Sequence, residues 1–218
     1  MMLTIAKFCV GVCAVPLAIG STVALYHNLS ALNGSSSAVS LFSWGVVSYV
    51  VLHLFFFKPT AVYVFGHELV HALAAWLCGG SVTSFSVGKN GGKVTATKSN
   101  MFITLSPYFV PLYTIIIATA YFVLMRSSDT GGRTFIFLIG LSLAFHIIMT
   151  IDVLKMRQPD MIRSGPFFSV VLVYIVNIFV ISGVFSILFS EFKLVQYLRE
   201  VFTVSRDVYY SIFCQLFK

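Results

Sequence analysis

The sequence predicts an all-α polytopic membrane protein with about six transmembrane helices and one small β-hairpin. Hydrophobic residues occupy 58% of its 218 positions and only 10% are charged, whereas about 25% are charged in an ordinary soluble domain. The mean hydropathy is +0.95. Long apolar runs take up most of the chain, and a single stretch alternates in the manner of paired strands. This composition excludes a disordered chain and leaves no room for a separate soluble domain.

Six apolar segments are each long enough to cross a bilayer, which requires about 20 residues. They are residues 3–26, 39–57, 60–79, 101–125, 134–156 and 166–190. We expect the first to be a retained helix, because no small-x-small cleavage site closes it. Residues 1–190 are therefore predicted to form one transmembrane domain of a multi-pass integral membrane protein.

The C-terminal residues 191–218 differ from the rest of the chain. They mix apolar and aromatic residues with Lys193, Arg199, Arg206 and Lys218, which predicts an amphipathic helix at the membrane interface. The net charge of +7 comes from 14 scattered basic residues. In a chain this apolar, they indicate contact with the lipid bilayer and not with nucleic acid.

The third apolar segment, residues 60–79, is expected to be a helix that ends at Gly79-Gly80. Residues 81–98 then alternate around an Asn90-Gly91 turn signal and predict a β-hairpin. Two interpretations of the hairpin remain open: a plain surface feature, or an edge to which an extended substrate adds as a strand. Pro107 and Pro111 predict that the segment 101–125 is kinked or broken.

Residues His67-Glu68-Leu69-Val70-His71 form an H-E-x-x-H motif within the third segment. On a helix, positions i and i+4 share a face, so both imidazoles can reach one Zn²⁺ ion, while Glu68 is placed to act as general base. An ionisable residue inside a span costs at least about 2.5–3.5 kcal/mol and usually marks function. The alternative interpretation is a buried polar cluster that holds helices together.

Two histidines leave a catalytic zinc site one protein ligand short. Asp160 lies in a loop after Pro159, and Asp152 lies near the end of the preceding span. The further candidates for this third ligand are Glu191, Glu200, His27, His53 and His146.

The motif and its surroundings resemble the site-2 protease family of intramembrane zinc metalloproteases. The matching residues run from Phe65 to Trp76, followed by Gly79-Gly80, and the resemblance covers residues 59–165. It implies an enzyme in which His67, His71 and a distant aspartate hold zinc and Glu68 activates water. It also implies a substrate that is a transmembrane segment of another protein, unwound locally. The family's usual Leu-Asp-Gly is missing here, so Asp160 is the first choice for the aspartate and Asp152 the alternative.

Two rival functions fit the same sequence. One is a catalytically inactive relative that binds transmembrane segments, and the other is a membrane zinc protease with a Glu ligand. The predicted topology also poses a geometric problem. If 101–125 and 134–156 both cross the bilayer fully, Asp152 and Asp160 fall on the membrane face opposite Lys58.

Overall fold

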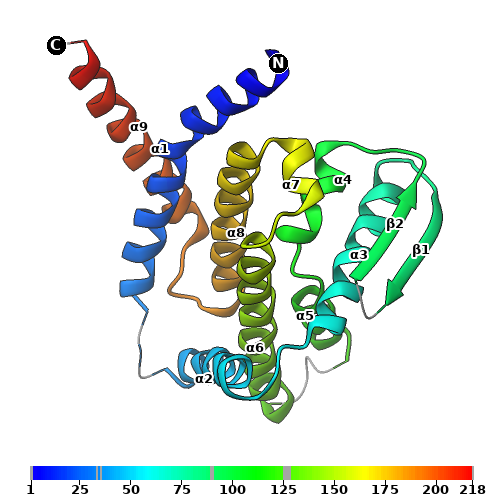
Figure 1. Cartoon of the computed structure of the whole chain (residues 1–218). Helices are drawn as coiled ribbons and strands as arrows, with labels where there is room; N and C mark the ends of the chain where they lie inside the picture. The colour runs from blue at the N-terminus through cyan, green and yellow to red at the C-terminus, as the bar shows by residue number, and fades with distance from the viewer. Residues whose placement is uncertain (1, 33, 35, 89–90, 125–128, 218) are drawn as a thin grey trace. The chain divides into compact units, whose positions relative to one another are not determined.

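The computed structural model describes residues 2–32, 34, 36–88, 91–124 and 129–217 (Figure 1). The chain forms two compact units, one made of Met1–Gly34 with Met161–Lys218 and the other of Ser35–Asp160. The sequence predicted a transmembrane domain in residues 1–190 and an interfacial helix in residues 191–218. The two compact units do not test this division, and it stays a prediction.

The first unit consists of three long helices, α1 (Met2–Ser30), α8 (Pro166–Leu188) and α9 (Leu194–Leu216). Helix α1 packs against both of the others. A Cβ at Gly20 would lie 2.9 Å from the backbone nitrogen of Ser205, so the missing side chain lets α1 approach α9 closely. Glu200 on α9 accepts a 2.8 Å hydrogen bond from Asn28 and pairs with His27, both at the end of α1.

The second unit is built around the contact between α2 (Ser37–Val51) and α6 (Asp129–Leu154). Helix α2 continues as a π-helix, η1 (Leu52–Phe56), and α5 (Leu112–Leu124) packs on α6. Glycines line the crossing of α2 and α6. A Cβ at Gly45 would lie 2.8 Å from the Leu141 nitrogen, and one at Gly140 would lie 3.0 Å from the Phe42 carbonyl carbon.

Helix α3 (Thr60–Leu77) carries the H-E-x-x-H motif and ends as predicted. Gly79 adopts a φ of 70°, and the Gly80 N–H donates to the Ala75 carbonyl at 2.8 Å, a bond that satisfies a carbonyl left free at the end of the helix. The predicted hairpin is confirmed as antiparallel strands β1 (Val82–Gly88) and β2 (Gly91–Ala96), which lie alongside α3 (Figure 1). Its turn residues, Lys89 and Asn90, lie outside the described residues.

The segment 101–125 is broken, as the prolines predicted. Helix α4 (Met101–Leu105) and a 3₁₀ turn, η2 (Ser106–Tyr108), are followed by α5 after a bend of 75°. The separation of Lys58 from Asp152 would follow only if 101–125 crossed the bilayer as one full span, and this segment is broken. Their side chains form an ion pair with an N–O distance of 2.6 Å.

The described helices include four that are long and apolar enough to span a membrane, or five if the bent pair is one span. Helix α3, whose motif places His67, Glu68 and His71 inside an otherwise apolar run, is not among these candidates. The all-α membrane fold with one hairpin is confirmed.

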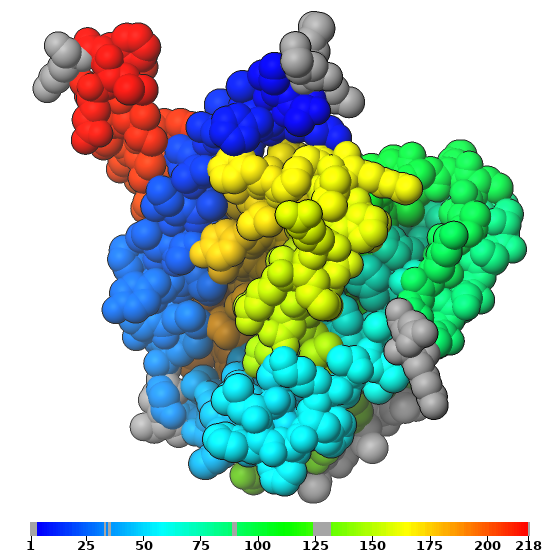
Figure 2. Space-filling model, viewed as in Figure 1, coloured from blue at the N-terminus to red at the C-terminus, as the bar shows by residue number. Residues whose placement is uncertain are grey.

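The outer surfaces of these helices are apolar. In the most hydrophobic window of each spanning helix only 22–50% of residues are buried. Phe55 and Phe56, in the segment that follows α2, are each 76% exposed. Figure 2 shows α1 in blue and the residues 40–57 in light blue to cyan at the surface. Lipid is the solvent that suits such surfaces, and the chain is a multi-pass integral membrane protein.

Candidate metal centre

The two histidines of the motif lie on one face of α3, as their i, i+4 spacing requires. Their ring centroids are 4.9 Å apart and the rings are nearly perpendicular. Both side chains are mostly buried, with exposed fractions of 11% for His67 and 13% for His71. Helix geometry alone therefore supplies two imidazoles that face a common point.

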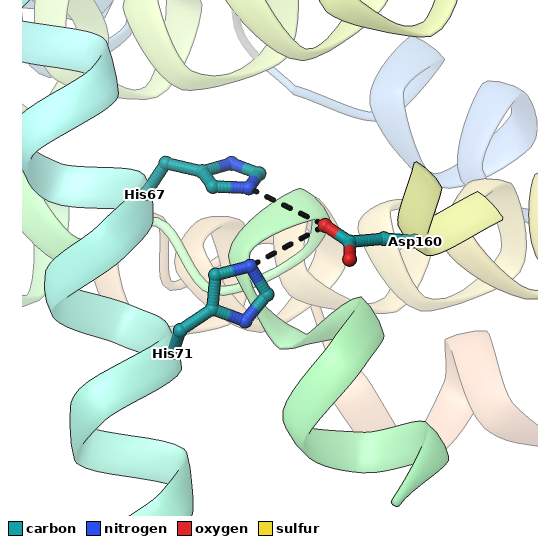
Figure 3. Close-up of side chains that lie close together, drawn as sticks. All are labelled: His67, His71 and Asp160. Carbon is teal, nitrogen blue, oxygen red and sulfur yellow. Dashed lines mark ion pairs between the residues drawn. The ribbon is translucent and has the colours of Figure 1, made fainter. Parts of the chain in front are cut away.

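Asp160 brings the third side chain to this point from α7 (Pro159–Ser164). Its Oδ2 lies 3.4 Å from His71 Nε2 and 3.9 Å from His67 Nε2 (Figure 3). Two ligands of a tetrahedral zinc ion, each bonded at about 2.0–2.1 Å, are roughly 3.3 Å apart. The separations therefore suit one metal ion, and all three ligand atoms lie within 4.8 Å of one another.

The orientation of His71 supports the same assignment. Its Nδ1 lies 2.8 Å from the Ile103 carbonyl oxygen, and only an N–H can make that contact, so Nδ1 carries the proton. The neutral ring then presents the lone pair of Nε2 to the cluster. Metal-bound histidines usually donate their second nitrogen to such a carbonyl, which fixes the tautomer and the ring orientation.

The environment of Asp160 keeps its carboxylate ionised. Burial raises the pKa of this carboxyl, but the adjacent imidazoles of His67 and His71 outweigh burial and hold the pKa well below its usual range. An ionised carboxylate beside two imidazoles is a donor set that suits zinc.

Glu68 lies next to the cluster, beneath the hairpin. It is 8% exposed and close enough to His71 and Asp160 to interact with both electrostatically. The Val94 N–H of β2 is directed at its carboxylate, and a Cβ at Gly92 would lie 2.9 Å from its Oε1. The backbone of the hairpin thus contacts the Glu68 carboxylate on one side and restricts its position.

Tyr108 is a member of this site that sequence reasoning missed. It is fully buried, its hydroxyl lies 3.3 Å from Asp160 Oδ2, and its ring meets His67 edge-on with centroids 4.9 Å apart. A tyrosine beside a proline in an apolar segment carries no sequence signal for this role. The only general rule that applies is that a buried tyrosine hydroxyl usually finds a hydrogen-bond partner.

Asp152, the alternative third ligand, has other partners. Its carboxylate pairs with Lys58 at 2.6 Å, Lys155 at 3.1 Å and His53 at 3.2 Å. The charge of Asp152 is thus compensated by two lysines and a histidine outside the cluster.

The other candidates for the third ligand also lie elsewhere. Glu200 bonds to His27 and Asn28, and Glu191 accepts a 3.2 Å hydrogen bond from Ser190. His146 lines a small cavity beside His67. In the described part of the chain, only His67, His71 and Asp160 form a group of three potential metal ligands.

A helical membrane domain with an H-E-x-x-H helix, a hairpin after it and a distant aspartate facing both histidines defines a site-2-protease-like membrane protein. The comparison with protein families agrees: the Peptidase M50B-like family model matches residues 37–208, and the chain belongs to that family. No curated protein and no solved structure matches it.

Proposed function

We propose that the protein is an intramembrane zinc metalloprotease that hydrolyses peptide bonds of membrane proteins within or near the bilayer. The observation that carries this proposal is the convergence of His67, His71 and Asp160 beside Glu68. The family membership supports the same reaction class.

Each residue of the cluster has a defined task in this proposal. His67 and His71 would hold the metal through their Nε2 atoms and Asp160 through its carboxylate. Zinc, when bound, polarises the scissile carbonyl and lowers the pKa of water to about 7. Glu68 takes the proton of the attacking water and delivers it to the leaving amine.

The hairpin suits a substrate in extended form. Strand β1 pairs only with β2 in the described residues and exposes Phe85 and Val87, which are 42% and 36% exposed. A substrate segment unwound from its helix can add to such an edge by backbone hydrogen bonds, with apolar side chains packing on Phe85 and Val87. The proposed partner is therefore a transmembrane segment of another protein.

The test uses the full-length protein in liposomes, with Zn²⁺ and a single-span test substrate that carries helix-breaking residues at mid-span. We expect the wild-type protein to cut this substrate and Glu68→Gln to be inactive while it retains one equivalent of zinc. Cleavage by Glu68→Gln at the wild-type rate would refute the assignment of Glu68 as general base. A wild-type protein with less than about one-tenth equivalent of zinc would favour the catalytically inactive alternative.

A further inference from the structure

Tyr108 occupies a special position in the chain. It closes the 3₁₀ turn η2 directly after Pro107 and before the 75° bend that leads into α5. This turn packs against α3, and the side chain of Tyr108 lies against the face of α3 that bears the motif.

Tyr108 contacts two of the three proposed ligands at once. The hydroxyl donates a 3.3 Å hydrogen bond to Oδ2 of Asp160, the same oxygen that faces both imidazoles. The ring lies edge-on against the ring of His67 at 87°. His67 benefits from this packing, because its Nδ1 is buried and has no hydrogen-bond partner among the described residues.

We propose that Tyr108 is a positioning residue of the metal centre, which holds the Asp160 carboxylate and the His67 ring in the orientation that the metal requires. The inference rests on the proposed function in one respect, namely that Asp160 is a metal ligand. The hydrogen bond from Tyr108 restricts rotation of the Asp160 carboxylate. A carboxylate that is already held in place loses less conformational entropy when it binds the metal. Partners of this kind typically contribute 10–100-fold to metal affinity.

The experiment measures zinc affinity and the Co²⁺ spectrum of the purified full-length protein in detergent. Tyr108→Phe removes the hydroxyl and keeps the ring. Tyr63→Phe is the matched control: Tyr63 is also buried and its ring lies 5.7 Å from that of His67, but its hydroxyl makes no hydrogen bond to Asp160. Co²⁺ reports the ligand geometry through its visible absorption, which zinc lacks.

We expect Tyr108→Phe to weaken zinc binding at least 10-fold and to shift the Co²⁺ spectrum, while Tyr63→Phe matches the wild type in both. In an Asp160→Ala background, Tyr108→Phe should weaken zinc binding no further, because the hydroxyl acts through that carboxylate. Thermal unfolding with a chelator present gives the stability of each metal-free variant and separates loss of ligand orientation from loss of folding.

Wild-type zinc affinity and an unchanged Co²⁺ spectrum in Tyr108→Phe would overturn the inference. So would a Tyr108→Phe protein that fails to fold even with zinc, since the hydroxyl would then serve overall stability. Both outcomes differ from a failure of the proposed function, in which the wild-type protein binds no zinc or Asp160→Ala binds it as tightly as the wild type.

Discussion

Gly92 of the hairpin lies directly against the side chain of Glu68: a Cβ at Gly92 would be 2.9 Å from both Cδ and Oε1 of the carboxylate. Such a distance is shorter than real Cβ contacts, so any larger residue displaces one of the two groups. The hairpin is held by its strand pairing, whereas a glutamate side chain rotates easily. The carboxylate is therefore the group that moves.

Gly92→Ala should lower the turnover of the single-span test substrate by roughly 100-fold, because a catalytic group displaced by about 1 Å loses that much. Zinc content and thermal stability should stay at wild-type levels. The measurement is the cleavage rate at saturating substrate, together with zinc analysis of the same preparation.

Gly88→Ala is the matched control, because it adds the same methyl group to the same hairpin. A Cβ at Gly88 meets only the Gly91 carbonyl oxygen, at 3.9 Å. Its turnover should equal that of the wild type. Equal rates for Gly92→Ala and Gly88→Ala would show that the contact with Glu68 has no catalytic role.

Replacement of the two candidate aspartates should have different consequences. Asp160→Ala should weaken zinc binding by more than 100-fold, since it removes one of three protein ligands. Asp152→Ala should retain zinc but lose the pairs with Lys58, Lys155 and His53. Partly exposed pairs contribute up to about 1 kcal/mol, so its midpoint of thermal unfolding should fall by roughly 2–4 °C. Loss of zinc from Asp152→Ala alone would reverse the assignment.

Removal of the metal should destabilise the wild-type protein, because its ligands come from α3 and α7, which lie far apart in the sequence. Free zinc at 100 times its dissociation constant stabilises the folded state by about 2.7 kcal/mol. Thermal unfolding with zinc and with a chelator measures this difference. His71→Ala should abolish the zinc-dependent shift and His53→Ala should retain it; a shift that persists in His71→Ala contradicts the proposed ligand set.

The crossing of α2 and α6 should be sensitive to the size of residue 140. A methyl group at Gly140 would press on backbone atoms of Phe42, which cannot rotate away. Gly140→Ala should therefore lower the free energy of unfolding by about 1–3 kcal/mol, measured by thermal unfolding in detergent. Gly183→Ala on α8 is the control, because nothing lies within 4 Å of its Cβ position. Equal stability of the two variants would argue against a tight crossing.

Much of the fold could be predicted from local sequence patterns. Apolar runs identified the long helices, Gly79 and Gly80 marked the end of α3, and alternation with a turn signal identified the hairpin. Pro107 and Pro111 predicted the break in the segment 101–125, whereas the size of the bend, 75°, came only from the structure.

The contacts around the site were harder to predict. Tyr108 is fully buried beside Asp160, yet in the sequence it is one aromatic residue among many. Gly92 belonged to a predicted turn region, where glycine is expected for its backbone freedom. Its contact with Glu68 depends on how the hairpin packs on α3, which no local pattern specifies.

The sequence by itself determined the membrane class, the helix that carries the motif and the shared face of His67 and His71, because each depends on composition or on the helical period. Only the tertiary structure decided which acid meets those histidines. Asp152 and Asp160 are only eight positions apart, but their side chains have different partners: Asp152 pairs with Lys58, while α7 carries Asp160 to the imidazoles. Long-range packing sets these distances, and a one-dimensional pattern does not contain them.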